Sequence, residues 1–306
     1  MRSEHTQSTK PILLLLLLLV ASSIAFHSQF AQMSVKKLSQ RIAVVTGGNK
    51  GIGYEIIKKL AKAEGVKAIL AARSNERGIE ACKTLKKDGY EVEFHRMDLN
   101  DKKSIADFSS WIKEKHGGLD ILVNNAAIAY KGSDPTPFQQ QAEPTMKTNF
   151  YGTLDVCDAL IPLMRKGGNI VNVASRSGTS ALSNMSSKMQ AEITDSKLTR
   201  EGLCGLVDKF IADVKGKKHS QAGWSNSCYG TSKLAVIVLS RILAEQLREK
   251  DISVTSMCPG WCKTDMSSHS GPRTAEQGAD TAAWLAVQTG EERPLGGFYG
   301  ERKKIM

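Results

Sequence analysis

The sequence predicts an α/β protein with a doubly wound parallel sheet, and two observations support this prediction. Short apolar runs alternate with helical patterns from Lys36 onward, which is the rhythm of βαβ units. The apolar runs are nearly continuous, as expected for strands that helices cover on both faces. With 306 residues, of which 41% are hydrophobic, the chain is long enough for one such domain with a full core.

Each apolar run is assigned to a strand and each periodic stretch to a helix. We expect strands at Ile42–Val45, Ala68–Ala71, Val92–His95, Ile121–Asn124, Asn169–Val173 and Ser253–Met257, with a last short one near Phe298. We expect helices at Gly53–Lys62, Glu76–Asp88, Lys102–His116, Ala142–Met164, Ser232–Lys250 and Ala275–Gln288. No internal repeat or second domain is visible, so residues 33–306 are predicted to form one catalytic domain.

One stretch interrupts this alternation. Between Ser177 and Gly223 the chain is polar and helix-prone, with apolar residues such as Leu203, Leu206 and Phe210 at helical spacings. We interpret residues 178–222 as a helical insertion that precedes the helix carrying Tyr229 and packs on the catalytic edge of the sheet.

Residues 1–32 are predicted to be a targeting leader rather than part of the fold. Two cations precede an apolar stretch from Ile12 to Phe26, and Ser23–Ala25 has the small-x-small pattern of a cleavage site. This indicates a signal peptide for the secretory pathway or ER. A stretch extended to Ala31 would suit a signal-anchor, and the position of Phe26 is similar to plastid-import leaders. If Met33 is the true start, the protein is cytoplasmic, and these alternatives stay open.

Charge and cysteine content narrow the class of ligand. The net charge of +11 favours anionic ligands, but the cations are scattered and only 6% of the residues are aromatic, so no nucleic-acid surface is predicted. None of the six cysteines forms a C-x-x-C pair or joins a cluster with zinc spacing, so no metal site is predicted. We therefore expect a small anionic ligand.

A glycine-rich turn, Thr46–Gly53, directly follows the first predicted strand. Gly47, Gly51 and Gly53 allow a tight turn and the close approach of phosphates that a Cβ would obstruct. The next helix offers unpaired N–H groups and the positive end of its dipole. This pattern predicts the pyrophosphate site of a dinucleotide.

Two cations indicate which dinucleotide binds. Arg73 lies about 20 residues after Gly53, where an NAD-preferring site carries an acidic residue for the ribose 2′-hydroxyl. A guanidinium suits a 2′-phosphate instead, and Lys50 in the glycine turn adds a second cation nearby. Both could be solvated surface charges, but their positions favour NADPH as the cofactor.

Polar residues stand at the ends of several other strands. Asp98 follows the third strand, where it could accept from an adenine amino group or cap a helix. Asn125 and Ser175 follow the fourth and fifth strands, where ligands of open α/β sheets bind. Asn149 lies inside a predicted helix, where asparagine is mildly unfavourable, and this exception suggests a polar task.

The most informative motif is Tyr229-Gly-Thr-Ser-Lys233, which places a phenol and an ammonium on one face of a helix. A tyrosine beside a lysine is a proton donor tuned toward neutral pH. Together with a nicotinamide site, the motif predicts hydride transfer to a carbonyl, with Tyr229 as the acid.

These motifs resemble the short-chain dehydrogenase/reductase family, which has the Rossmann fold. The matches in identity and order are TGGNKGIG (46–53), Asn124-Asn-Ala, Asn149, Ser175, Tyr229-x-x-x-Lys233 and Pro259-Gly260. Within the family, the chain is most similar to the monomeric NADPH-dependent carbonyl reductases, through Asp134–Phe138, Thr145–Phe150, Gly223-Trp224 and Cys258–Met266. The resemblance covers residues 38–304.

The resemblance implies a role for each motif. Tyr229 would protonate the carbonyl oxygen, and Lys233 would lower its pKa and hold the nicotinamide ribose. Ser175 would bind the substrate oxygen, and Asn149 would support a water-linked proton relay. The implied cofactor contacts are Gly47, Asn49, Lys50, Ile52, Arg73, Asp98, Asn125 and Thr264. The insertion resembles the segment that covers the dimerisation face of carbonyl reductases, which implies a monomer.

We therefore predict NADPH-dependent reduction of ketones, aldehydes or quinones, in a pocket lined by Tyr130, Trp224, Trp261 and the insertion. Two departures from the family pattern leave the substrate preference open. Ala127 stands where a glycine is expected, and Arg176-Ser177 are polar where this subgroup often has apolar residues.

Two other functions are compatible with parts of the sequence. A membrane-associated NADP⁺-dependent alcohol, retinol or steroid dehydrogenase would suit the leader, which would then stay uncleaved. Arg73 and Lys50 favour the reductive cofactor instead. A catalytically silent dinucleotide-binding sensor is the other alternative, but such proteins usually lose the tyrosine or the lysine, and both are present here.

Overall fold

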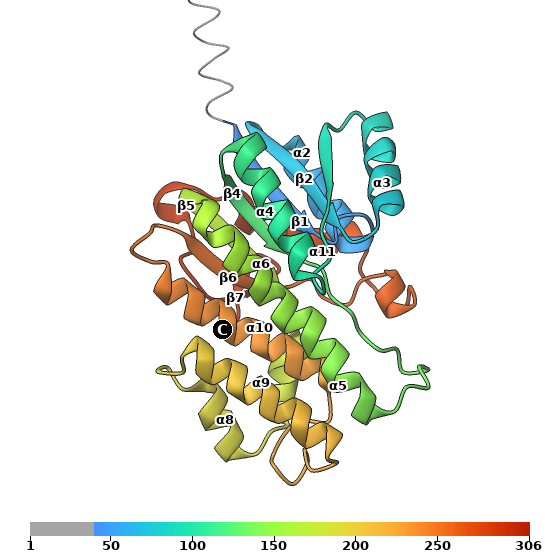
Figure 1. Ribbon diagram of the computed structural model, residues 1–306, viewed down its shortest axis with the longest axis vertical. Coiled ribbons are helices and arrows are strands. Elements are labelled where there is room, and N and C mark those ends of the chain that lie inside the picture. The colour runs from blue at the N-terminus through green and yellow to red at the C-terminus, as the bar shows by residue number, and fades with distance from the viewer. Residues whose placement is uncertain (1–39) are drawn as a thin grey trace, which may run out of the picture. The chain divides into compact units, whose positions relative to one another are not determined.

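A sheet with the strand order β3–β2–β1–β4–β5–β6–β7–β8 organises residues 40–306, which are the residues that the computed structural model describes (Figure 1). The strands are β1 (Arg41–Thr46), β2 (Val66–Ala72), β3 (Val92–Arg96), β4 (Leu119–Asn124), β5 (Met164–Val173), β6 (Ser253–Cys258), β7 (Phe298–Gly300) and β8 (Lys303–Lys304). The first seven are parallel, and β8 pairs antiparallel with β7. The predicted α/β fold and its seven strands are confirmed, whereas the leader over 1–32 lies outside the described residues.

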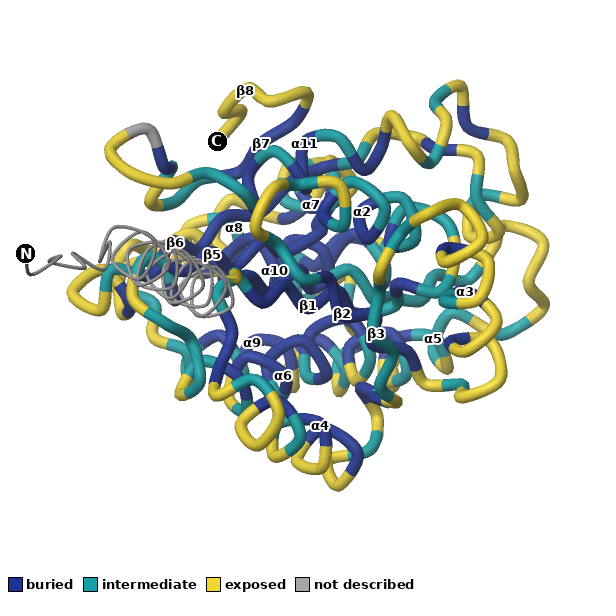
Figure 2. Tube along the Cα trace, turned by 90° about the horizontal axis from the view of Figure 1, so that it is seen from above, coloured by how far each residue is buried: buried dark blue, intermediate teal, exposed yellow. Residues whose placement is uncertain are grey.

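Helices cover both faces of the sheet. One face carries α2 (Gly51–Lys62), α3 (Asn75–Lys87) and α11 (Ala275–Val287), and the other carries α4 (Lys102–His116), α5 (Phe138–Met146), α6 (Gly152–Leu160) and α10 (Cys228–Gln246). The central strands are buried between these layers (Figure 2), and β1 is buried from Ile42 to Thr46. Burial on both faces explains why the strands read as unbroken apolar runs.

The order of the strands reverses at β1, which pairs with β2 on one side and β4 on the other. The chain therefore leaves β1 and β4 toward opposite sides of the sheet. Such a switch point opens a crevice beyond the carboxyl ends of the strands, where ligands of this architecture bind. The glycine turn follows β1 and Asn125 follows β4, so both lie at this crevice.

The helix predicted over Ala142–Met164 is present, but it starts at Phe138, ends before Met164 and is not a regular α-helix throughout. Helix α5 passes into a π-helical turn at Lys147–Tyr151, α6 follows, and a short 3₁₀ turn at Ile161–Leu163 ends the segment before β5. A proline at position 162 removes a backbone donor, which explains the end of the helix. The π turn contains Asn149, and such turns are frequent at functional sites.

Helix α10 begins at Cys228, four residues before the predicted start at Ser232. Ser227 caps it by accepting a hydrogen bond from the backbone N–H of Gly230 at 2.9 Å. The earlier start places Tyr229 in the first turn of the helix.

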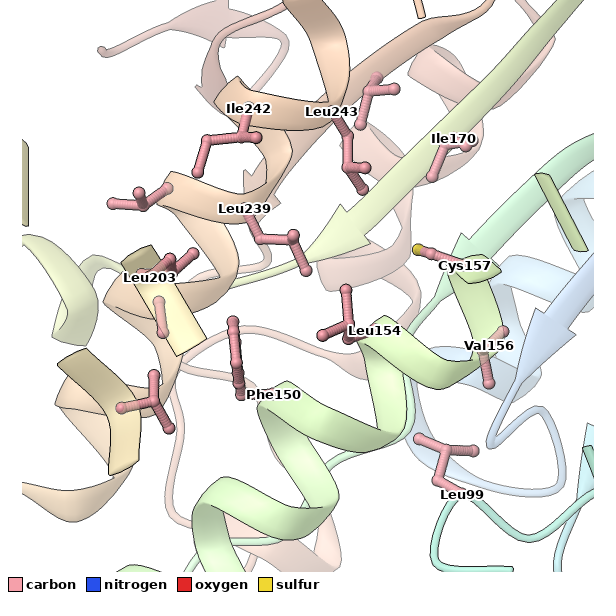
Figure 3. Close-up of a cluster of buried hydrophobic side chains, with 14 of the residues drawn as sticks. Leu99, Phe150, Leu154, Val156, Cys157, Ile170, Leu203, Leu239, Ile242 and Leu243 are labelled. Carbon is pink, nitrogen blue, oxygen red and sulfur yellow. The ribbon is translucent and has the colours of Figure 1, made fainter. Parts of the chain in front are cut away.

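The insertion forms three helices, α7 (Arg176–Ser183), α8 (Ser187–Thr194) and α9 (Arg200–Lys215). Helix α7 packs on α10. Helix α9 packs on α5 and α10, and Figure 1 shows it beside these two helices. The side chain of Leu203 enters a cluster with Phe150 and Leu239 (Figure 3), and Leu206 and Phe210 are buried as well. The insertion therefore covers helices of the catalytic layer, and not the edge of the sheet that we had expected.

Within residues 40–306, none of the helices combines the length and the apolar character that a bilayer crossing requires.

Candidate active site

Helix α10 carries the two central side chains of the site. The Nζ atom of Lys233 lies 5.7 Å from the centroid of the Tyr229 ring, so the two side chains share one face of the helix as the spacing predicts. Because the Ser227 cap holds the first turn, the backbone of Tyr229 is placed by a regular helix rather than by a loop.

Lys233 is almost fully buried, with 4% of its surface exposed. Its Nζ donates a hydrogen bond to the carbonyl oxygen of Val173, the last residue of β5, at 2.8 Å. Burial disfavours the ammonium form and lowers the pKa of Lys233 to about 8. The contact ties α10 to the carboxyl end of β5, two residues before Ser175.

The environment of Tyr229 determines the protonation state of its phenol. Burial, the largest cause, and the Cys258 sulfur together raise the pKa of the phenol to about 12, although the Ser175 hydroxyl lowers it in part. Tyr229 is therefore protonated at neutral pH, which is the form that a proton donor needs. The lowering of this pKa by Lys233, whose ammonium donates to the Val173 carbonyl, stays a prediction.

Ser175 is the N-cap of α7, directly after β5. Its hydroxyl oxygen accepts a hydrogen bond from the backbone N–H of Ser177 at 3.1 Å. A hydrogen bond with the same hydroxyl lowers the pKa of the Tyr229 phenol, so the predicted serine and tyrosine lie together at the site.

Asn149 is 1% exposed and connects two parts of the site. Its Oδ1 accepts from the backbone N–H of Ile128 at 2.8 Å, and its Nδ2 donates to the Ile128 carbonyl at 2.9 Å. The Nδ2 also donates to the Ser232 hydroxyl at 3.0 Å. Asn149 thus fastens the segment after β4 to the first turns of α10, while the predicted water-linked relay stays a prediction.

The glycine turn has the backbone that its sequence predicts. Gly47 and Gly51 have φ values of 65° and 57°, in the region that favours glycine. Gly53 serves close packing instead, because a Cβ there would lie 2.4 Å from Asn125 Nδ2 and 2.4 Å from the Gly47 oxygen.

Asn125 supports this turn from β4. Its Nδ2 donates to the carbonyl oxygens of Thr46 at 2.9 Å and Gly47 at 3.3 Å. Asn125 therefore shapes the glycine turn through its Nδ2, while its predicted contact with the cofactor stays a prediction.

Two adjoining cavities of about 410 and 380 Å³ form a groove along this crevice. Both are lined by Gly47, Asn49 and Lys50. The first also contains Arg73 and Asp98, and the second contains Gly51, Ile52, Asn125 and Thr264. The structure thus brings the predicted cofactor residues of the glycine turn and the strand ends into one groove, with Gly53 packed behind it.

Positive charge gathers at this groove. The Arg73 side chain is exposed there, and Arg77 on α3 lines the same cavity. Sequence reasoning missed Arg77, which lies four residues after Arg73 in the first turn of α3. The Lys50 Nζ contacts Asp265 Oδ2 at 2.6 Å, and both side chains are more than half exposed, so water keeps this ion pair weak. The Asp98 Oδ1 accepts from the Asn100 N–H at 3.0 Å, at the same end of the groove.

The structure gives different surroundings to the three aromatic residues that are predicted to line the substrate pocket. Trp224 is 4% exposed, its Nε1 donates to Asp213 Oδ2 at 2.9 Å, and its ring packs edge-on against Phe210. The prediction that it lines a pocket is wrong, because it belongs to the core of the insertion. Trp261 is 61% exposed, and Tyr130 is half-buried in the segment after β4. Both remain open to a ligand.

Sequence reasoning gave Cys258 no role at the site. This buried residue ends β6, and its sulfur accepts the backbone N–H groups of Arg176 at 3.2 Å and Gly260 at 3.4 Å. It therefore joins the start of α7 to the Pro259–Trp261 turn beside Tyr229. Two signals could have found it: Cys258 stands at the end of a predicted strand, and it opens the Cys258–Met266 motif shared with the carbonyl reductases.

A family model for short chain dehydrogenases matches residues 41–188 and 210–275. The chain belongs to this family, as the resemblance of its motifs predicts. The residues between the two matched segments, 189–209, fall within the insertion.

Similar proteins agree with this assignment. Carbonyl reductase (NADPH) 1 of Sus scrofa is 43% identical over 270 residues, which cover 87% of this chain and 93% of the relative. Carbonyl reductase (NADPH) 3 of Rattus norvegicus is 45% identical over 251 residues, covering 81% and 91%. Among solved structures, salutaridine reductase from Papaver somniferum superimposes with a TM-score of 0.77 at 31% identity, covering 85% of this chain and 99% of that one.

Proposed function

We propose that the protein is an NADPH-dependent carbonyl reductase that converts ketones, aldehydes or quinones to alcohols. The observation that carries this proposal is the Tyr229–Lys233 pair, with Lys233 buried, which Asn149 ties to Ile128 in the lining of the groove. The names of the similar carbonyl reductases support the same reaction and cofactor.

The groove fits NADPH in shape and charge. The left-handed glycines at 47 and 51 keep the pyrophosphate subsite free of side chains, and the start of α2 offers its N–H groups there. Arg73 and Arg77 would hold the 2′-phosphate, with Lys50 nearby, because guanidinium groups bind phosphate in a bidentate manner. When bound, NADPH supplies the hydride for the reaction.

The protein's own residues supply the proton. The Tyr229 hydroxyl donates its proton to the substrate oxygen, and a pKa of about 12 keeps this proton in place at neutral pH until the oxygen becomes strongly basic. The Ser175 hydroxyl would orient the same oxygen, and Lys233 would bind the ribose. Asn149 positions Tyr229 and Lys233 by holding α10 against the segment after β4.

A direct assay tests this proposal. Purified protein should oxidise NADPH faster than NADH in the presence of menadione or an aldehyde. NADP⁺ with secondary alcohols tests the alternative of an oxidising dehydrogenase. Activity only in the oxidative direction, or none in either direction, would count against the proposal.

We also propose that the protein is a monomer. A short-chain enzyme pairs subunits through the helices after its fourth and fifth strands, and here α9 packs on α5 and α10 through buried residues such as Leu203 and Phe210. Residues 34–306 should therefore scatter light as a monomer at micromolar concentration. Excision of 180–221 should expose this apolar surface and cause association. A stable dimer of the intact chain would contradict this proposal.

Targeting of the chain by residues 1–32 is a further proposal, and it rests on the sequence pattern alone. Mass spectrometry of the N-terminus of protein isolated from cells would distinguish a cleaved leader from a retained one or from a start at Met33.

A further inference from the structure

An arginine stands directly beside the proposed catalytic serine. Arg176 is the first residue of α7, for which Ser175 is the N-cap, and it is exposed. Its Nη2 lies 3.6 Å from the position that a Cβ on Gly300 would occupy. The guanidinium therefore extends across the carboxyl ends of β6 and β7, where substrates of open α/β sheets bind.

The hydrogen bonding of the arginines sets Arg176 apart. Within residues 40–306, nine of the twelve arginines donate through the guanidinium to an oxygen of the protein, namely Arg41, Arg96, Arg165, Arg200, Arg241, Arg248, Arg273, Arg293 and Arg302. Arg73, Arg77 and Arg176 have no such acceptor in this part of the chain. Arg73 and Arg77 line the groove in which a phosphate is expected. The guanidinium of Arg176 likewise has no acceptor among the described residues, and Arg176 directly follows Ser175.

Cys258 shows how close Arg176 is to that centre. The Cys258 sulfur accepts the backbone N–H of Arg176 at 3.2 Å and that of Gly260 at 3.4 Å. The same sulfur also raises the pKa of Tyr229 and of Lys233. The backbone of Arg176 is therefore anchored between Ser175 and the end of β6, and its guanidinium lies beside Gly300.

The surroundings do not neutralise the guanidinium. Glu301 follows Gly300, but its Oε1 is already paired with Arg273 Nη1 at 2.5 Å. On the other side of Cys258, the turn through Gly260 presents Trp261, which is 61% exposed. The chain thus presents an exposed guanidinium at Arg176 and an exposed indole at Trp261, and the Cys258 sulfur binds the backbone N–H groups of Arg176 and Gly260.

We propose, on the basis of the proposed carbonyl reduction, that Arg176 is a specificity-determining residue that selects carbonyl substrates bearing a carboxylate. A planar guanidinium binds a carboxylate through two parallel hydrogen bonds, which orients as well as attracts the substrate. A cationic substrate is disfavoured at the same place because like charges repel.

Three aldehydes of similar shape test this role: 4-carboxybenzaldehyde, neutral 4-nitrobenzaldehyde and cationic 4-(trimethylammonio)benzaldehyde. Arg176→Leu should lower kcat/KM for the carboxylate about tenfold relative to the wild type. It should leave the neutral aldehyde nearly unchanged and raise kcat/KM for the cationic one. Arg176→Lys keeps the charge without the fork and should retain part of the preference for the carboxylate.

Arg248→Leu is the matched control, because Arg248 is also exposed and lies beyond the end of α10. Arg248→Leu should leave kcat/KM unchanged for all three aldehydes. Affinity for NADPH should be equal in all variants, and Arg176→Gln replaces Arg176→Leu if the latter does not fold.

An equal loss with all three aldehydes, or no loss with the carboxylate, would overturn the role of Arg176. That result differs from failure of the proposed function, in which the wild type reduces not even the neutral aldehyde with NADPH.

Discussion

The catalytic centre and the cofactor groove lie side by side, but they are built in different ways. Lys233 and Asn149 are buried, and each is hydrogen-bonded to the backbone of another element. Lys50, Arg73 and Arg77 are exposed, and none of the three is held by the protein core. The centre therefore has a fixed geometry before any ligand binds, whereas the groove keeps its charges in water until a phosphate replaces that water.

This difference has a functional consequence. A proton donor works only at a defined position, and burial supplies that position at the cost of shifted pKa values. Phosphate binding depends on charge and tolerates mobile side chains, as surface arginines are. Substitutions in the two regions should therefore affect different kinetic constants.

The largest effect is expected for Tyr229→Phe, which removes the phenol hydroxyl and keeps the ring. Turnover should fall by ~10²–10⁴, as is typical when acid catalysis is lost. Binding of NADPH, followed by fluorescence titration, should stay near the wild-type value because the groove is unchanged. Near-normal turnover would refute the assignment of Tyr229 as the proton donor.

A smaller effect, on KM for the cofactor and not on turnover, is expected for Arg73→Asp. Loss of a charge-assisted contact and the added repulsion should raise KM for NADPH by about 10- to 100-fold. KM for NADH and the turnover number should change little, since NADH lacks the 2′-phosphate. Arg77→Ala should show a weaker form of the same pattern, and Arg248→Asp, at an exposed site beyond α10, serves as the control. Equal effects on both cofactors would show that Arg73 does not contact the phosphate.

The smallest effect concerns stability at the catalytic centre. Burial lowers the pKa of Lys233 from its ordinary value of 10.5 to about 8 in the folded protein, so the ammonium destabilises the fold at neutral pH. Lys233→Met should therefore raise the free energy of unfolding at pH 7 by about 1–3 kcal/mol while abolishing activity.

The pH dependence provides a check on this assignment. Between pH 8 and 10.5 the unfolded wild type binds more protons than the folded form, so wild-type stability rises with pH in this window. The advantage of Lys233→Met should accordingly shrink when denaturant unfolding is repeated at about pH 9.5. A constant difference between the two proteins would contradict the lowered pKa.

The outcomes for individual residues show which kinds of inference a sequence supports. The glycine turn, Arg73 and the Tyr229–Lys233 spacing were predicted correctly in place, because each depends on local backbone geometry or on position after a strand. Trp224 was misplaced because an aromatic side chain near a catalytic residue can face either a pocket or a core, and only packing distinguishes the two.

The sequence by itself determined the order of strands and helices, the glycine turn and the identity of the reacting side chains, because periodicity and local conformational preference act over a few residues. Only the tertiary structure decided how those side chains are held. It placed Asn149 in a π-helical turn, turned Lys233 toward the Val173 carbonyl and brought the backbone of Arg176 to Cys258. These contacts join residues far apart in the chain, and burial decides both their geometry and the pKa values of the groups involved.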